Sequence, residues 1–238
     1  MDLPTALRGI ANRARRDEKH RFGHLYTLLN EANLRHCYGA LNRKAAVGVD
    51  GEDWREYGEE LQDRLTGLVK RLKEGRYRAR LIRRKHIPKE PGKTRPLGIP
   101  VTEDKLLQRG GASILEAIYE ADFLNSSWGY RPKRSARAAT KQLAAALGGG
   151  RYQWVVEADI RGFFEHIEGG WLIRMLEERV NDRAFLRLIR KWLAAGVLEE
   201  DGRITHPATG TPQGGVISPI LANVYLHYAL DLWFERVV

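Results

Sequence analysis

Asp159 is the carboxylate whose neighbours in the sequence most strongly indicate a chemical role. It follows a mostly apolar run of tryptophan and valine, which predicts a β-strand over residues 153–160. A carboxylate at the end of a buried strand must face a partner charge or a metal ion, because burying it unpaired is costly. Mg²⁺ prefers oxygen donors, so a strand-end aspartate beside a backbone carbonyl is a candidate magnesium ligand. An aspartate that caps the following helix is the alternative.

A second candidate site lies in residues 210–226, which read GTPQGGVISPILANVYL. Gly214 and Gly215 allow the backbone to approach a ligand closely, because glycine has no Cβ. Gln213 carries both a donor and an acceptor, which suits contact with a nucleotide or a base pair. Pro219 fits the first turn of a helix. We interpret the segment as a ligand-binding loop that leads into a helix; a glycine-rich linker is the alternative.

Positive charge is concentrated between Lys70 and Arg95. This window holds twelve Lys or Arg and two acids, so its net charge equals the +10 of the whole 238-residue chain. A localised basic patch indicates a polyanionic partner, either nucleic acid or an anionic membrane. A solvated charged face is the alternative.

The composition narrows the class of protein. A hydrophobic content of 43%, a charged content of 29% and six tryptophans indicate a folded globular chain. Cys37 is the single cysteine, which excludes a disulfide within the chain and a cysteine-based zinc site. The sequence has no signal-peptide core and no apolar stretch of roughly 18 residues. We therefore expect a cytoplasmic protein with at most a peripheral role at a membrane.

Hydrophobic periodicity and turn chemistry predict the elements that must position these residues. Pro91 and Gly92 predict a tight turn, and hence a two-stranded hairpin with a basic tip over residues 78–99. Gly110 and Gly111 fall inside a predicted helix and are expected to loosen it. The remaining expectations are helices over 2–45, 53–74, 103–121, 135–147, 170–195 and 217–235, a loop over 47–51, an irregular stretch over 126–132, a boundary at 148–150 and a hairpin over 197–205.

Several groups of residues together resemble the group II intron-type reverse transcriptases. Asp159, Ile160 and residues 162–164 are similar to the first catalytic motif of that family, and residues 210–226 are similar to the motif that follows it in the palm. Other segments resemble the N-terminal extension and the fingers motifs of the same branch, namely residues 48–51, 87–89, 92–93, 95–100, 122–123, 127, 129–132 and 134–135. The similarity runs in the right order over roughly residues 20–238.

This resemblance implies an α+β fold. It consists of an N-terminal helical extension (residues 1–78), the fingers of a right-hand polymerase (79–150) and a partial palm (151–238). It also implies that Asp159, helped by the Ile160 carbonyl, binds catalytic Mg²⁺. The implied activity is RNA-directed DNA synthesis for a group II intron-like element.

The resemblance assigns further residues to substrates. Lys93 and Arg95 would hold the triphosphate of an incoming dNTP, Gln213 would line the nucleotide pocket, and Phe164 would exclude a 2′-hydroxyl. The implied nucleic-acid partners are an RNA template or intron RNA and a DNA primer, contacted mainly through phosphates and therefore in a salt-dependent way. The expected RNA-binding residues are Arg76, Arg78, Arg80, Arg83, Arg84, Lys85, Lys89, Arg131, Lys133 and Arg134.

The chain departs from the family in one respect. The next motif of the family is a Tyr-X-Asp-Asp strand, whereas this chain contains no Asp-Asp pair and ends at Val238. Nucleotidyl transfer uses two metal ions about 4 Å apart, which one carboxylate and one carbonyl hold poorly. We expect the chain alone to polymerise poorly or not at all, as a truncated product or as half of a split enzyme. The alternatives are a non-catalytic, maturase-like RNA-binding module and a chain whose palm a protein partner completes.

Overall fold

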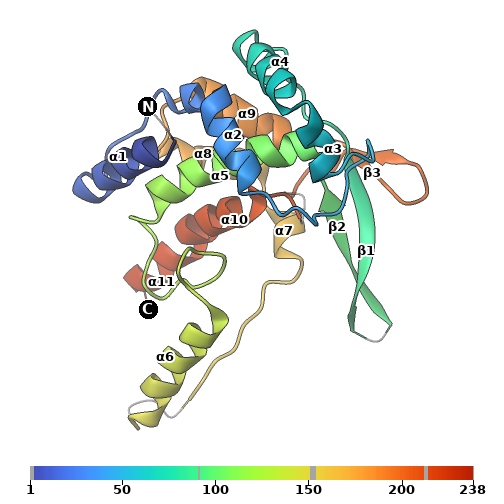
Figure 1. The fold of residues 1–238 in the computed structure, drawn as a ribbon. Helices are drawn as coiled ribbons and strands as arrows, with labels where there is room; N and C mark the ends of the chain where they lie inside the picture. Colours follow the sequence, from blue (N-terminus) through green and yellow to red (C-terminus); the bar gives the residue numbers. More distant parts are fainter. Residues whose placement is uncertain (1–2, 91, 151–153, 212–213, 238) are drawn as a thin grey trace.

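The N-terminal third of the chain is helical, as predicted. The computed structural model describes residues 3–90, 92–150, 154–211 and 214–237 (Figure 1). Asn30 caps α2 by accepting from the Asn33 amide, and Asp53 forms a capping box with Glu56 at the start of α3. The helix predicted over residues 53–74 is therefore two helices that meet at Glu60. The elements of this part are α1 (Leu3–Arg16), η1 (Leu25–Leu28), α2 (Glu31–Gly39), α3 (Trp54–Glu59) and α4 (Leu61–Lys73).

Helix α5 (Thr102–Tyr119) runs through the centre of the molecule and is buried along most of its length (Figure 1). A Cβ at Gly110 would lie 2.9 Å from the Leu29 side chain, and a Cβ at Gly111 would lie 3.1 Å from the Trp192 ring. The two glycines therefore let neighbouring elements pack closely against α5. The local loosening expected from the two glycines stays a prediction, while Leu29 and Trp192 use the space that a Cβ would take.

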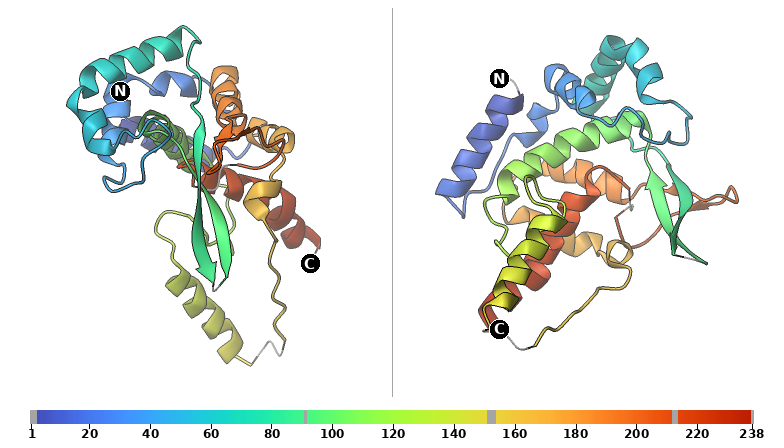
Figure 2. Two further views of the ribbon diagram at one scale, coloured as in Figure 1. Left: turned by 90° about the vertical axis from the view of Figure 1, so that its right-hand side faces the viewer. Right: turned by 60° about the horizontal axis from the view of Figure 1, so that its bottom comes forward.

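The two predicted hairpins join in one sheet. Strands β1 (Ile82–Glu90) and β2 (Lys93–Ile99) pair antiparallel, β3 (Val197–Leu198) pairs antiparallel with β4 (Ile204–Thr205), and the order is β2-β1-β3-β4. The link between the hairpins is parallel, with Ile82 opposite Val197. Most of the β1–β2 hairpin extends beyond the short second pair and projects from the helical body (Figures 1 and 2).

The C-terminal part is mostly helical and completes the core. Asp182 caps α9 by accepting from the amides of Ala184 and Phe185. The apolar sides of α8, α9 and α10 share one hydrophobic core with α5 and the N-terminal helices. The elements are α7 (Phe163–His166), α8 (Gly169–Glu177), α9 (Arg183–Leu193), α10 (Ser218–Leu226), the π-helix η2 (His227–Asp231) and α11 (Leu232–Val237).

The strand predicted over residues 153–160 is absent from the described residues 154–160. These residues adopt no regular structure and are exposed, with Trp154 at 88% and Val156 at 93%. The sequence has the right composition for a strand, but a strand also needs a neighbouring backbone to bond, and the described chain offers none here. Helix α6 (Ala136–Gly148), capped by Ser135 as predicted, has no buried residue, and it projects from the body together with this segment (Figures 1 and 2).

The described helices include none that is both long enough and apolar enough to span a bilayer.

Candidate nucleotide and nucleic-acid site

Three segments that are distant in the sequence meet at the base of the β1–β2 hairpin. The Thr211 amide donates to the Phe164 carbonyl over 2.9 Å, and the Gly210 amide donates to the Ile167 carbonyl over 2.7 Å. These bonds hold the loop before α10 against the turn that carries Phe164. A Cβ at Gly210 would lie 3.0 Å from the Phe164 carbonyl oxygen, so the close approach requires glycine.

Gly214 joins this loop to the hairpin. Its φ is +114°, and a Cβ there would lie 2.5 Å from the Gly98 carbonyl oxygen of β2. From the other side, the Val216 amide donates to Gln108 Oε1 over 2.9 Å. Gln108 lies buried in α5, so the central helix fixes the loop directly. The sequence analysis missed Gln108, although a glutamine inside an otherwise apolar helix is the kind of residue that needs a partner.

Phe164 belongs to a chain of aromatic side chains. It is half-buried, and its ring lies 5.8 Å from Phe163 and 6.4 Å from Tyr130, both edge to face. Phe163 in turn lies 6.3 Å from Tyr225 of α10. Gly162, with φ +62°, turns the chain into α7 and presents the two phenylalanines. The arrangement places Phe164 next to the 209–217 loop, as a residue that lines the same site would be.

The predicted metal ligands lie on the exposed segment that precedes α7. Asp159 is exposed and Ile160 is 51% exposed. A carboxylate and a carbonyl have the donor chemistry that Mg²⁺ prefers. Among the described residues, however, no group of three or more Asp, Glu, His or Cys could hold a metal ion together. Asp159 and Ile160 thus offer the kind of donor atom that Mg²⁺ prefers, but they offer too few donors to hold the ions. Gln213 lies outside the described residues.

The basic hairpin has two different faces. Residues that pair across antiparallel strands point to the same side, and Lys85 pairs with Leu97 whereas Ile87 pairs with Arg95. Arg83, Lys85 and Arg95 therefore share one face, here called the cationic face. On the opposite face, Arg84 Nε lies 3.3 Å from Glu199, and His86 Nδ1 lies 3.1 Å from Glu200.

The cationic face is the more available of the two. Lys85 and Arg95 are exposed and Arg83 is half-buried. Elsewhere in the basic window Arg76 is paired with Glu74, and Arg78, Arg80, Lys89 and Lys93 are exposed. The charge predicted from the sequence is thus present at the surface, but Glu199 and Glu200, in the turn between β3 and β4, neutralise part of it. Sequence alone could not separate the paired cations from the others.

Arg131 requires a correction, because its guanidinium is directed inward. The side chain is 4% exposed and lies 3.1 Å from Glu120. Its Nη1 donates to the carbonyls of Leu124 and Ser127 over 2.7 and 2.8 Å. These bonds hold the loop between α5 and α6 together, so Arg131 does not fit the predicted RNA-binding role. Lys133 is exposed, and Arg134 stacks on Trp128 while donating to the Asn125 carbonyl over 2.7 Å.

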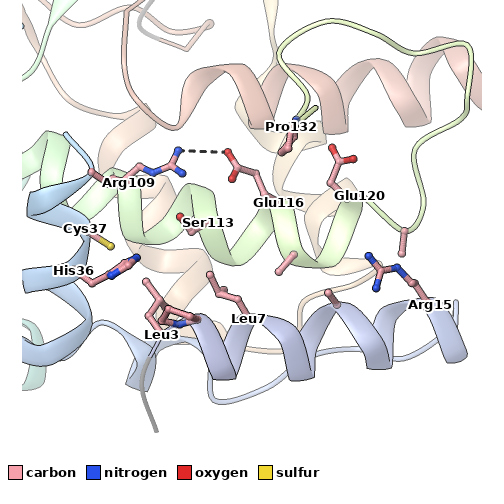
Figure 3. Close-up of a pocket in the computed structure, with 15 residues that line it drawn as sticks. Leu3, Leu7, Arg15, His36, Cys37, Arg109, Ser113, Glu116, Glu120 and Pro132 are labelled. Carbon is pink, nitrogen blue, oxygen red and sulfur yellow. Dashed lines mark ion pairs between the residues drawn. The ribbon is translucent and has the colours of Figure 1, made fainter. Parts of the chain in front are cut away.

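Away from this site, a cavity of about 420 Å³ lies between α1, α2 and α5 (Figure 3). Its walls are largely apolar, and its charged lining residues are two arginines and two glutamates. Arg109 lies 3.6 Å from Glu116, and Glu120 is the partner of Arg131. Burial raises the pKa of the adjacent Cys37 thiol to about 11, so this cysteine is a poor nucleophile.

Comparison with known proteins agrees with this architecture. A family model described as reverse transcriptase (RNA-dependent DNA polymerase) matches residues 87–237. The chain is 42% identical over 167 residues to the group II intron-encoded protein LtrA of Lactococcus lactis subsp. cremoris, covering 70% of this chain and 27% of LtrA. It is 37% identical over 192 residues to the protein YkfC of Escherichia coli, covering 79% of this chain and 50% of YkfC.

A solved structure shares the fold. The partial Cas6-RT-Cas1–Cas2 complex matches with a TM-score of 0.56 at 21% identity, covering 91% of this chain and 35% of the other. The chain therefore belongs to the reverse transcriptase family. Within that family it is of the group II intron type, as the resemblance implied. It spans about a quarter of the length of LtrA and half of the length of YkfC.

Proposed function

We propose that this chain supplies the fingers, and the first catalytic carboxylate of the palm, to an RNA-directed DNA polymerase of a group II intron-like element. The observation that carries the proposal is the meeting of β2, the Phe164 turn and the 209–217 loop at the base of a basic hairpin. Those are the segments that a template and an incoming nucleotide would have to contact together. The N-terminal extension, fingers and partial palm are assigned to residues 1–78, 79–150 and 151–238.

The substrate roles follow the same geometry. Arg95 lies on the cationic face, where its fork can hold a triphosphate, and Lys93 adds a point charge at the start of β2. Phe164 would pack under the sugar of a dNTP, and Gln213 would line the pocket beside Gly214. The RNA template would follow the exposed cations of the hairpin, with a DNA primer beside it.

Mg²⁺ is the cofactor of this proposal. When bound, it would act as a Lewis acid on phosphate oxygens. Asp159 and the Ile160 carbonyl would hold it, but two ions need further carboxylates. We propose that a protein segment carrying them completes the palm beside residues 154–160, whose apolar side chains are exposed. A non-catalytic, maturase-like RNA-binding role is the second candidate, since the basic hairpin requires no metal.

RNA binding tests the proposed template path. We expect the chain to bind a single-stranded RNA oligonucleotide with a strong salt dependence. Replacing Arg83, Lys85 and Arg95 together by Gln should reduce the slope of log K against log salt by about 2, since each lost phosphate contact removes about 0.7. The measurement is fluorescence anisotropy across a salt series.

A matched variant controls for net charge. Arg13, Arg190 and Arg203 are each paired with a carboxylate and lie outside the predicted RNA-binding residues, so their combined replacement by Gln removes the same charge from positions already neutralised. This variant should retain most of the slope. Equal loss in both variants would show that RNA responds to total charge and not to the cationic face.

Primer extension separates the two candidate functions. The full chain is incubated with an RNA template, a DNA primer, dNTPs and Mg²⁺, beside its Asp159→Asn form. We expect RNA binding by both proteins and little extension by either, because the metal donors are too few. Extension by the native chain that Asp159→Asn abolishes would show a catalytic Asp159 and contradict the need for a completing segment. Extension that survives the substitution would exclude Asp159 as the metal ligand.

A further inference from the structure

A second cation-lined pocket lies apart from the two strands of the hairpin, and its Lys73 belongs to the basic window between Lys70 and Arg95. It is bounded by η1, α4 and α9, in the upper part of Figure 1 on the side opposite α6. Its volume is about 460 Å³, within the range of pockets that take small ligands. None of its lining residues belongs to the hairpin, to α7 or to the 209–217 loop.

The floor of this pocket is apolar. Leu29, Val69, Leu72 and Leu188 line it, and each side chain is at most 5% exposed. Tyr26 closes one wall, with its hydroxyl donating to the Leu72 carbonyl over 3.1 Å. A flat apolar group could therefore lie against this floor without leaving a polar atom of the floor unpaired.

The rim is cationic. Lys73, Arg187 and Lys191 line the pocket, and among the described residues no carboxylate does so. Lys73 and Arg187 are exposed. Lys191 is held in place, because its Nζ donates to the Tyr77 carbonyl over 2.6 Å and contacts the Gly75 carbonyl at 3.4 Å. Three positive charges around an apolar floor form a receptor for an anion with an apolar body.

The nearest buried acid does not cancel these charges. Asp182 lies behind the pocket and accepts from the backbone amides of Tyr26, Ala184 and Phe185 over 2.8, 3.0 and 3.0 Å. Its oxygens are thus used by the protein. Burial raises the pKa of Tyr26; the positive charge of Arg187 opposes this rise and the negative charge of Asp182 adds to it. The cavity between α1, α2 and α5 differs, because the acids Glu116 and Glu120 line it as well as arginines, and Arg109 lies 3.6 Å from Glu116 (Figure 3).

We propose that this pocket binds a nucleotide unit, with the base on the apolar floor and the phosphate on Lys73, Arg187 and Lys191. The unit is either a free mononucleotide or one nucleotide of an RNA strand. This second site is separate from the template path along the hairpin, so each can fail without the other.

The test uses the full chain and two ligands, AMP by calorimetry and a single-stranded RNA oligonucleotide by anisotropy. Replacing Lys73 and Arg187 by Gln should weaken the binding of at least one ligand tenfold or more, and adenosine should bind the native chain much more weakly than AMP. The control replaces Arg183 and Arg190 by Gln, which removes the same charge from α9 outside the pocket.

The outcomes separate the two sources of the nucleotide. Saturable AMP binding that only the Lys73/Arg187 variant loses identifies a free-nucleotide site. No AMP binding, with RNA affinity lowered in that variant and kept in the control, identifies an RNA contact. If both variants leave both ligands unchanged, or weaken them equally, the proposal is wrong. The variant that replaces Arg83, Lys85 and Arg95 should still bind AMP. A failure of the pocket proposal is therefore distinguishable from a failure of the proposed template path.

Discussion

At the root of the hairpin, a buried carboxylate links three elements. Asp104 of α5 accepts from the Tyr77 hydroxyl over 2.6 Å and from the Arg80 amide over 2.9 Å. The Tyr77 hydroxyl also accepts from Trp192 Nε1 of α9 over 2.9 Å. The chain that leads into β1 is thereby tied to both helices. Such a network positions the hairpin through side chains buried behind it.

Asp104 makes stability depend on pH. Burial raises its pKa to about 6 against the lowering effect of its hydrogen bonds from Tyr77 and Arg80, whereas the ordinary value is 3.8. The folded state therefore binds the proton more tightly, and this contribution to stability is lost as pH rises from about 4 to about 6. The free energy of unfolding of Asp104→Asn, relative to the native chain, should rise by up to about 3 kcal/mol over that window.

Urea unfolding at a series of pH values measures this difference. The same series on Asp17→Asn, a carboxylate at the surface, serves as the control. A difference between Asp104→Asn and the native chain that stays constant from pH 4 to pH 6 would contradict a raised pKa at Asp104.

Arg131 provides a second prediction for a single residue. Its guanidinium is buried and bonded to Glu120 and to two carbonyls. Arg131→Gln should lower the free energy of unfolding by about 2–3 kcal/mol, since charged hydrogen bonds are lost and buried carbonyls are left unpaired. Lys133→Gln, an exposed neighbour, should change it by about 0.5 kcal/mol or less. A large loss of RNA affinity in Arg131→Gln with unchanged stability would restore the RNA-binding role.

The hairpin and the 209–217 loop contact each other through backbone atoms, so a glycine at this contact cannot be replaced freely by a larger residue. Gly214 combines a positive φ with a Cβ position 2.5 Å from the Gly98 carbonyl oxygen. Neither backbone can move without disturbing β2 or the bond from Val216 to Gln108. Glycine here allows close packing between two elements, whereas the sequence predicted a close approach of the backbone to a ligand.

Gly214→Ala should therefore destabilise the junction more than φ strain alone does. Gly202 is the matched control, since its φ is +85° but a Cβ there meets nothing within 4 Å. We expect Gly202→Ala to lower the free energy of unfolding by about 1–2 kcal/mol, and Gly214→Ala to add a clash cost of at least about 1 kcal/mol. Hydrogen exchange should also show faster exchange of the Val216 amide in Gly214→Ala only. Equal effects at both positions would argue against the contact with β2.

Across the whole molecule, one core joins all three predicted segments. Leu34 and Tyr57 come from the first, Leu115 from the second, and Ile189 and Leu221 from the third. The boundaries at residues 78 and 150 stay a prediction about the functional parts of the chain, while the hydrophobic core continues across both of them. Helices α6 and α11 and residues 154–160 contribute no buried residue to this core, and most of the β1–β2 hairpin projects away from it.

This division predicts how the folded chain responds to protease. Trypsin should cut first at Arg137, Lys141 and Arg161, which lie exposed on α6 or beside the irregular segment. The two large pieces should then stay together in size-exclusion chromatography, because α5 packs against elements from both sides of the cut. Early cleavage within α5 or α9, or separation of the pieces without denaturant, would contradict the packing described here.

Much of the fold was predictable because the signals are local. The capped helix starts, the Pro91–Gly92 turn and the order of the motifs each depend on a few neighbouring residues, and the helices and both hairpins formed where they were expected. The family resemblance was confirmed for the same reason, since its motifs are short strings. The roles of Asp159, Lys93, Arg95, Phe164 and Gln213 stay predictions.

The predictions that did not hold all depend on residues that are far apart in the sequence and close together in the fold. Residues 154–160 have strand composition, but pairing requires a second backbone that composition does not provide. Arg131 has the side chain of an RNA-binding residue, yet Glu120 lies within reach only after α5 and its following loop fold together. Gly111 would weaken an isolated helix, whereas in the fold the Trp192 ring packs close to the position of its missing Cβ. Local conformation follows from adjacent residues, but burial, charge pairing and strand pairing follow from contacts between residues far apart in the chain.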